Sequence, residues 1–238
     1  MLLSSAVYRS TQVVAGVAIT LFIGLMLKMV MPYLSFEPGI HFLTTKSAAI
    51  NENALFRVGF YVHITSSCWV LVIGLLQFFP ALWRNRRKVH QQLGKAYIVS
   101  ILALAAPSGL VLAFFANGGL SAKVGFTMQC VVWWLCTYQA YRLARQRQWE
   151  AHIQWMLRSF LVTLAAMSLR LESYTLYYAF GTKPIETYLT VVWLSWTGNL
   201  LLAEALIQAG AARYLLRDFY KNTISTALSQ PQNQAVPA

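Results

Sequence analysis

The chain contains six long apolar segments, and its basic residues are concentrated in every second gap between them. A helix needs about 20 apolar residues to cross the hydrocarbon layer of a bilayer, and each segment is long enough to do so. We therefore predict an all-α polytopic membrane bundle of six transmembrane helices. The expected segments are Thr11–Leu34, Val58–Leu82, Leu93–Phe115, Val124–Ala144, Ile153–Leu176 and Thr187–Gln208.

The Lys and Arg residues outside the segments predict how this bundle is oriented. Twelve of the nineteen lie in the two terminal tails, or in the gaps between segments two and three and between segments four and five together with the segment ends that border these gaps. Only four lie in the remaining gaps. The positive-inside rule then places both termini in the cytoplasm, with the basic loops against anionic headgroups. We expect the chain to reside in a cell membrane, the bacterial cytoplasmic membrane being the expected one.

The composition excludes a soluble nucleic-acid-binding protein, although the net charge is +12. Charged residues make up 11% of the chain, whereas soluble domains have about 25%. The basic residues flank apolar segments instead of forming a stripe along one soluble helix, which a phosphate-binding face would require. The bilayer is therefore the expected partner, and nucleic acid is not. The sequence assigns neither a protein partner nor an oligomeric state.

The chain is expected to form one domain followed by a tail. Residues 1–222 hold the six segments, and residues 223–238 are polar, uncharged and contain two prolines, which is typical of a disordered tail. The first segment is expected to be a retained anchor, because its apolar stretch is long and no A-x-A site follows it. Asn117, Gly118 and Gly119 predict a tight turn between segments three and four.

Ionisable side chains inside the segments are the best indication of a functional site. Each costs roughly 2.5–3.5 kcal/mol on insertion scales, so it should face the bundle interior and have a partner. In segment five, His152, Ser159, Thr163 and Arg170 would share one stripe of a continuous helix. A path between the two membrane surfaces could follow this stripe and a similar one in segment two.

Two layers of polar residues are expected at different depths. The cytoplasmic layer is a candidate ligand-binding site of Gln77, His90, His152, Arg158 and Glu204. The outer layer is a second group of polar residues, made of His63, Arg170 and Glu172. A purely structural interpretation stays open, in which Arg158 pairs with Glu204 and Arg170 with Glu172 or a backbone carbonyl.

His90 and His152 occupy equivalent places, because each follows a basic connection and opens a segment that heads outward. If their hairpins pack side by side, the two imidazoles meet at one depth. Neutral imidazole is a common ligand of metal ions and of haem iron. The two histidines are therefore candidate metal ligands, with haem b or a metal ion as the candidate cofactor and Glu204 as a possible third group. No established metal-binding or haem-attachment string occurs.

The same stretches resemble domain-of-unknown-function family 2306, a family of predicted membrane proteins. The resemblance covers about residues 58–208. Besides His63, it rests on GLLQF at 74–78, HQQLGKAY at 90–97, SGLVLAFFANGGLSAKVGF at 108–126, HIQWMLRSFLVTLAAMSLRL at 152–171 and WTGNLLLAE at 196–204. The family usually has Arg after each of the two histidines, whereas this chain has Gln91 and Ile153. The resemblance implies a multi-pass bundle and no particular activity.

Three functions remain open at this point. The first is binding of a ligand, haem or a metal ion, through the inward-facing histidines near the cytoplasmic side. The second is a proton-coupled carrier for a small solute, using the polar stripes of segments two and five. The third is a membrane scaffold or assembly factor without catalysis. The sequence shows no nucleophile–base pair, phosphate loop or carboxylate pair, so it does not favour a hydrolase.

Overall fold

A computed structural model describes residues 5–37, 40–79 and 86–217, and within these ranges the side chains from residue 16 onward except that of residue 41. The tail expected over 223–238 and the last part of expected segment two lie outside these residues. All regular elements within the described ranges are helices. They are α1 (Ser5–Val30), the 3-10 helices η1 (Met31–Ser35) and η2 (His41–Thr45), α2 (Ala48–Glu52), α3 (Ala54–Gln77), α5 (Arg87–Val99), the π-helix η3 (Ser100–Ala105), α6 (Ala106–Phe114), α7 (Gly119–Arg145), α8 (Trp149–Thr163), α9 (Ala165–Phe180) and α10 (Pro184–Gln208).

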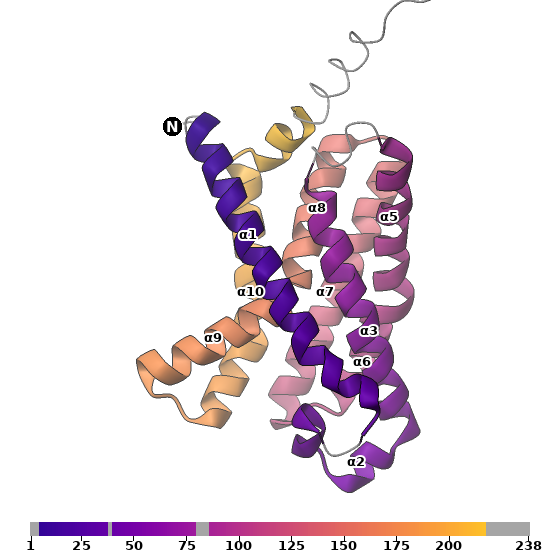
Figure 1. Cartoon of the computed structure of the whole chain (residues 1–238), viewed down its shortest axis with the longest axis vertical. Coiled ribbons are helices and arrows are strands. Elements are labelled where there is room, and N and C mark those ends of the chain that lie inside the picture. Colours follow the sequence, from indigo (N-terminus) through magenta and orange to yellow (C-terminus); the bar gives the residue numbers. More distant parts are fainter. Residues whose placement is uncertain (1–4, 38–39, 80–85, 218–238) are drawn as a thin grey trace, which may run out of the picture.

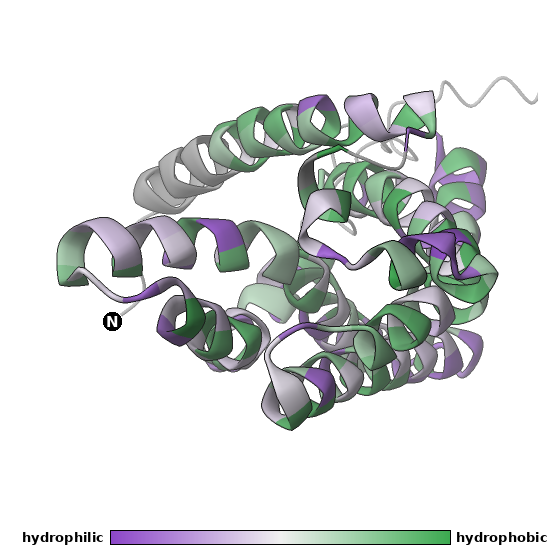
Figure 2. Ribbon diagram, turned by 90° about the horizontal axis from the view of Figure 1, so that it is seen from below, coloured by the Kyte–Doolittle hydropathy of each residue, from purple (hydrophilic) through white to green (hydrophobic). Residues whose placement is uncertain are grey.

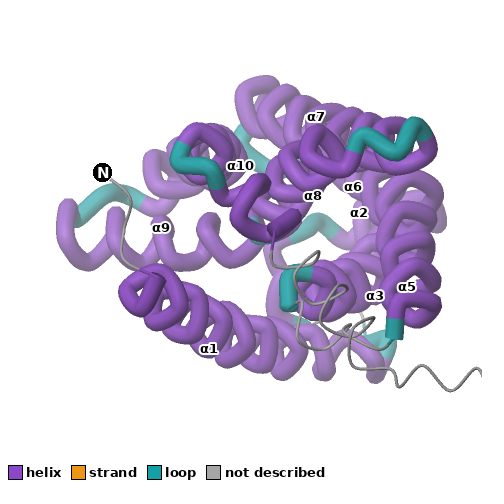
Figure 3. The backbone as a smooth tube through the Cα atoms, turned by 90° about the horizontal axis from the view of Figure 1, so that it is seen from above, coloured by secondary structure: helices purple, strands orange, loops and turns teal. Residues whose placement is uncertain are grey.

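Four rods form the centre of the molecule: α3, the continuous run α5–η3–α6, α7 and α8 (Figure 1). Consecutive rods run antiparallel and pack against one another, and α8 closes the ring by packing on α3. Buried apolar side chains from all four fill the space between them, among them Val70, Ile101, Trp133 and Val162. The rods α5 and α8 therefore run parallel to each other on opposite corners of this bundle (Figure 3).

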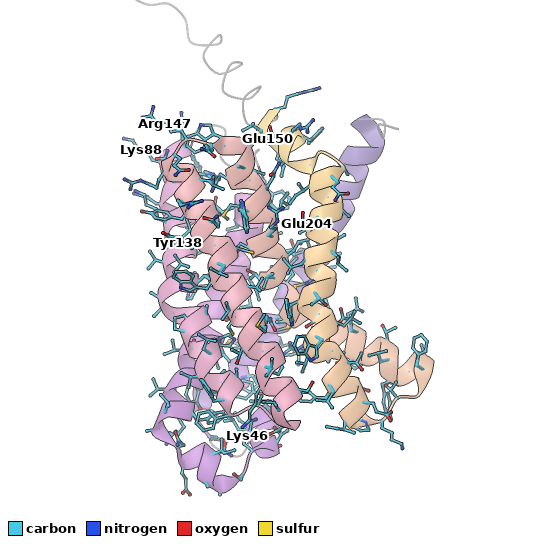
Figure 4. All side chains as sticks on the ribbon, turned by 180° about the vertical axis from the view of Figure 1, so that it is seen from behind. Lys46, Lys88, Tyr138, Arg147, Glu150 and Glu204 are labelled. Atoms are coloured by element: carbon cyan, nitrogen blue, oxygen red, sulfur yellow. The ribbon has the colours of Figure 1, made fainter. Side chains whose placement is uncertain are left out.

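The remaining long helices pack on the outside of the bundle. α1 lies against α3, whereas α10 packs on α8, α9 and α7. α1 begins and α10 ends at the end of the bundle where α5 and α8 begin (Figure 1). We call this the histidine end, because His90 and His152 lie in the first turns of α5 and α8. Lys88 and Arg147 lie at this end and Lys46 at the opposite end (Figure 4).

Four helical stretches are long and apolar enough to cross a membrane, and Figure 2 shows apolar residues along the long helices. These stretches are Gly16–Ser35, Ala54–Gln77, Arg87–Phe114 and Pro184–Gln208. Length and composition thus identify four membrane-spanning stretches in the described residues, whereas the sequence predicted six. α7 has 27 residues, but its Trp, Tyr and Gln side chains lower its mean hydropathy. Expected segment five is divided into two shorter helices.

The division of segment five contradicts the prediction of one continuous helix over Ile153–Leu176. α8 ends at Thr163, and α9 starts at Ala165 in a new direction that leads away from the bundle (Figure 1). Neither Pro nor Gly causes the break. The Thr163 hydroxyl donates to the carbonyl of Ser159 at 2.9 Å, a contact that weakens and bends helices.

Asn199 of α10 holds the corner between α8 and α9. Its Nδ2 donates to the carbonyl of Leu161 at 2.9 Å, in the last turn of α8, where carbonyls lack helical partners. Its Oδ1 accepts from the Ser168 hydroxyl of α9, also at 2.9 Å. One buried amide thus joins three helices. Asn199 lies off the face of its segment that carries Glu204, so the helical period does not predict it as a site residue.

We expect Asn199→Ala to destabilise the corner by about 1–3 kcal/mol, because the substitution leaves the Leu161 carbonyl and the Ser168 hydroxyl without their partner. The change would be measured as a lower thermal unfolding temperature in detergent. Thr197→Val on the same helix is the control, since the Thr197 hydroxyl bonds only to carbonyls of its own helix. Equal unfolding temperatures for Asn199→Ala and the wild type would contradict this role.

The turn between α6 and α7 forms where the sequence predicts it. Gly118 and Gly119 have φ values of 84° and 73°, which favour glycine. The buried Lys46, from the segment that follows α1, donates to the carbonyl of Phe115 at 2.6 Å and to Oδ1 of Asn117 at 3.0 Å. Burial lowers the pKa of the Lys46 ammonium below its usual range. These bonds fasten the long connection between α1 and α3 to the opposite end of the bundle.

Candidate functional site

His90 and His152 occupy matching positions in two parallel helices. Each is the fourth residue of its helix, α5 for His90 and α8 for His152. Each donates its backbone N–H to the residue just before the helix, His90 to Arg86 at 3.1 Å and His152 to Gln148 at 2.9 Å. Because α5 and α8 stand on opposite corners of the bundle, the two side chains enter one layer from different sides.

The two imidazoles interact electrostatically with each other across this layer. Nδ1 of His152 donates to the carbonyl of Ala140 in α7 at 2.8 Å. A carbonyl only accepts, so this bond fixes the tautomer and leaves Nε2 of a neutral His152 with a free lone pair. Metal-bound histidines in proteins are commonly oriented in this way, by a second hydrogen bond to a carbonyl or carboxylate.

Gln77 supplies a third polar group at the same level. Its Nε2 donates to the backbone carbonyl of His90 at 3.0 Å and lies against Gly94, one turn further along α5. The side chain is only 7% exposed. Its Oε1 is buried and has no hydrogen-bond donor among the described residues. A buried acceptor without a donor costs about 1–3 kcal/mol, so it favours a ligand that bears a donor or a positive charge.

Arg158 and Glu204 form an ion pair that faces away from the histidines. Nε of Arg158 donates to Oε1 of Glu204 at 2.6 Å, and Nη2 donates to Oε2 at 2.9 Å. The guanidinium also lies over the ring of Trp155, 4.6 Å from its centroid. The pair joins α8 to α10, whereas His152 on the same helix faces α7. The sequence left open a purely structural interpretation in which Arg158 pairs with Glu204, and this pairing is present.

A cluster of buried hydroxyl groups, the hydroxyl cluster, lies about 10 Å from the histidine layer, seven residues along α5 and α8. The Tyr97 hydroxyl contacts the hydroxyls of Ser159 at 3.0 Å and Thr163 at 3.1 Å. Thr137 contacts Ser159 at 2.7 Å, and Nε1 of Trp133 donates to Thr163 at 2.9 Å. The hydroxyl groups can thus satisfy one another without water. This cluster joins α5, α7 and α8, the two helices that carry the histidines and the helix between them.

We expect Tyr97→Phe to lower the free energy of unfolding by about 1–3 kcal/mol, since it removes two buried hydrogen bonds. Unfolding in detergent, followed by circular dichroism, would measure the loss. Tyr138→Phe is the matched control, because Tyr138 is exposed on α7 (Figure 4). If the two variants unfolded alike, the cluster would not be holding the bundle.

The residues of the expected outer layer belong to different parts of the molecule. His63 lies inside the bundle, where its Nδ1 donates to the carbonyl of Ala105 at 2.8 Å and its ring packs against Gly109. Arg170 lies on α9 and donates to the carbonyl of Ala166 of its own helix at 2.7 Å. The break at Leu164 removes Arg170 from the stripe that His152, Ser159 and Thr163 share on α8.

The donor groups near His90 and His152 limit which ligands this layer could hold. No three His, Cys, Asp or Glu side chains of the described chain lie close enough together to hold a metal ion. A b-type haem needs only two axial imidazoles, which His90 and His152 would supply.

The apolar helices and the polar residues enclosed by the bundle define a multi-pass helical membrane protein. Residues 60–207 match the family described as "Predicted membrane protein (DUF2306)", and the chain belongs to this family. A 55-residue stretch, 23% of the chain, is 44% identical to the Ava biosynthesis cluster protein G of Aspergillus versicolor. The match spans only 15% of that relative. No solved structure matches the chain.

Proposed function

We propose that the protein binds a ligand between His90 and His152, with haem b as the ligand that best fits a bis-histidine site and a metal ion as the other candidate. The proposal is supported by the electrostatic influence of His152 on His90 and by the buried Oε1 of Gln77, which has no donor among the described residues. Bound haem would supply one-electron chemistry at its iron. The protein groups hold and orient the ligand, with Ala140 keeping His152 in one tautomer and Gln77 accepting from the ligand.

This proposal is tested by an absorption spectrum and metal analysis of protein purified in mild detergent from iron- and haem-replete cells. Haem binding predicts a Soret band and about one iron per chain. Binding of a metal ion predicts about one metal per chain without a Soret band. A colourless preparation free of metal would overturn the site, and would favour the scaffold interpretation.

We also propose that the chain crosses the membrane six times as a single domain, with the histidine end in the cytoplasm of a bacterial cell. The support is that α7 runs between the same two ends as the apolar stretches, that α8 and α9 together connect α7 to α10, and that Lys88 and Arg147 lie at the histidine end (Figure 4). A reporter fused at Gly118 should be active outside the cytoplasm. A cytoplasmic reporter at that position would reverse the orientation.

A solute carrier is the second candidate, and one observation favours it. Discontinuous helices near the middle of the membrane are common in carriers, and α8 ends at Thr163 part-way along the bundle. The carbonyl of Leu161 at this break is occupied by Asn199, which reduces its use as a solute ligand. Proton-driven uptake into proteoliposomes that stops in His63→Ala would support a carrier, and uptake equal to that of empty liposomes would exclude it.

A further inference from the structure

Arg170 of α9 is a half-buried cation whose hydrogen-bonding capacity is largely unused. A guanidinium carries five N–H donors, and one of them donates to the carbonyl of Ala166. No other acceptor for this guanidinium, and no carboxylate partner, occurs among the described residues. Glu172 lies only two residues away but faces elsewhere, and its buried Oε2 is unpaired within the described chain. The side chain of Arg170 therefore fits an anionic ligand from outside the protein.

The surroundings of Arg170 show where such a ligand would come from. The guanidinium interacts electrostatically with the phenols of Tyr33 and Tyr174, so it faces the space between α9 and the segment that follows α1. Figure 3 shows α9 extending outward from the bundle on the same side as α1. The apolar side chains Leu21 and Leu25 of α1 and Leu171 of α9 are exposed.

The depth of α9 follows from the helix after it. α10 is one of the four stretches that can cross the membrane, and only three residues separate its first residue, Pro184, from the end of α9. The end of α9 therefore lies near a membrane surface. Its last turns expose Tyr174, Tyr177 and Tyr178, and tyrosine is enriched at the level of the lipid headgroups. Arg170 is one turn nearer the bundle along α9, within reach of a phosphate because long basic side chains extend toward the interface.

We propose that Arg170 binds the phosphate of a phospholipid at the end of the bundle opposite the histidines. A guanidinium matches phosphate through paired, charge-assisted hydrogen bonds. The acyl chains of the lipid lie along the exposed apolar side chains of α1 and α9. The lipid then anchors α9 at the membrane surface, since α9 packs mainly against α10 and the end of α8.

Binding of dioleoylphosphatidylglycerol to detergent-purified, delipidated protein tests this proposal by native mass spectrometry. We expect wild type to retain the lipid and Arg170→Gln to bind it about tenfold more weakly or worse. Arg57→Gln is the control, since Arg57 is exposed near the same end. Arg170→Lys keeps the charge but loses the paired geometry, so it should bind with intermediate affinity.

Each outcome of this experiment decides the proposal. Undiminished lipid binding by Arg170→Gln would overturn it, and so would a loss of the same size in Arg57→Gln. If Arg170→Gln does not fold, Arg170→Lys decides, because binding equal to wild type would leave no role for the guanidinium geometry. Inorganic phosphate that binds as tightly as the lipid would overturn the lipid as ligand. None of these results depends on occupancy of the histidine site.

Discussion

Replacing both His90 and His152 by Ala is expected to abolish ligand binding, so that the purified variant has neither a Soret band nor bound metal. The reason is that both proposed ligand nitrogens are lost, while the hydroxyl cluster that packs α5, α7 and α8 is untouched. Absorption spectroscopy and metal analysis on the same preparation measure the loss. Thermal unfolding of the variant in detergent would show that the bundle persists.

The single variants refine this expectation. His152→Ala should bind more weakly than His90→Ala, because Ala140 holds His152 in the tautomer that leaves Nε2 free for coordination. Gln77→Leu should retain the ligand with reduced affinity, by about 1–3 kcal/mol, since it removes one acceptor. His63→Ala is the control from the other layer and should keep full occupancy. Full occupancy in the double histidine variant would place the ligand elsewhere.

The second large effect is expected at the ion pair between α8 and α10. Removing Glu204 leaves the guanidinium of Arg158, which is 18% exposed, beside apolar helices without its carboxylate. Breaking such a pair costs about 3–5 kcal/mol in a fully buried site. The carboxylate of Glu204 is 43% exposed, so we expect about 2 kcal/mol for Glu204→Ala. Chemical unfolding in detergent micelles is the appropriate measurement.

The exchanged double variant Arg158→Glu with Glu204→Arg separates pairing from side-chain size. Each single change places like charges together and should destabilise the protein, whereas the exchange should recover most of the lost stability. Recovery would assign this pair to the packing of α10 on α8. If instead the exchanged variant kept its stability but lost the bound ligand, Arg158 would belong to the ligand site as well.

The family match begins within α3 and ends at the penultimate residue of α10. It therefore includes most of the bundle, both helices of the corner at Leu164 and the ion pair, but not α1. α1 is the first apolar stretch and packs mainly against α3. The candidate histidine site thus lies wholly within the part of the chain that the family shares, whereas the proposed lipid site is completed by α1.

Features that depend on neighbouring residues in the chain could be predicted from the sequence. The apolar segments fix an all-helical membrane protein, because helices satisfy their own backbone in lipid. The equivalent positions of His90 and His152 follow from where two helices start after basic connections. The turn at Gly118 and Gly119 follows from the backbone conformations that glycine allows. The face shared by His152, Ser159 and Thr163 follows from the helical period within α8.

The tertiary structure decided everything that depends on which groups meet across helices. The helical period of segment five places Arg170 on the stripe only if the helix continues. α8 instead ends at Thr163, whose hydroxyl donates to the Ser159 carbonyl. The role of Asn199 depends on the carbonyl that this break exposes. Likewise, the orientation of Arg158 toward α10 and the unpaired oxygen of Gln77 follow from packing. A one-dimensional pattern shows which residues share a face, but only neighbouring helices determine which polar groups find partners.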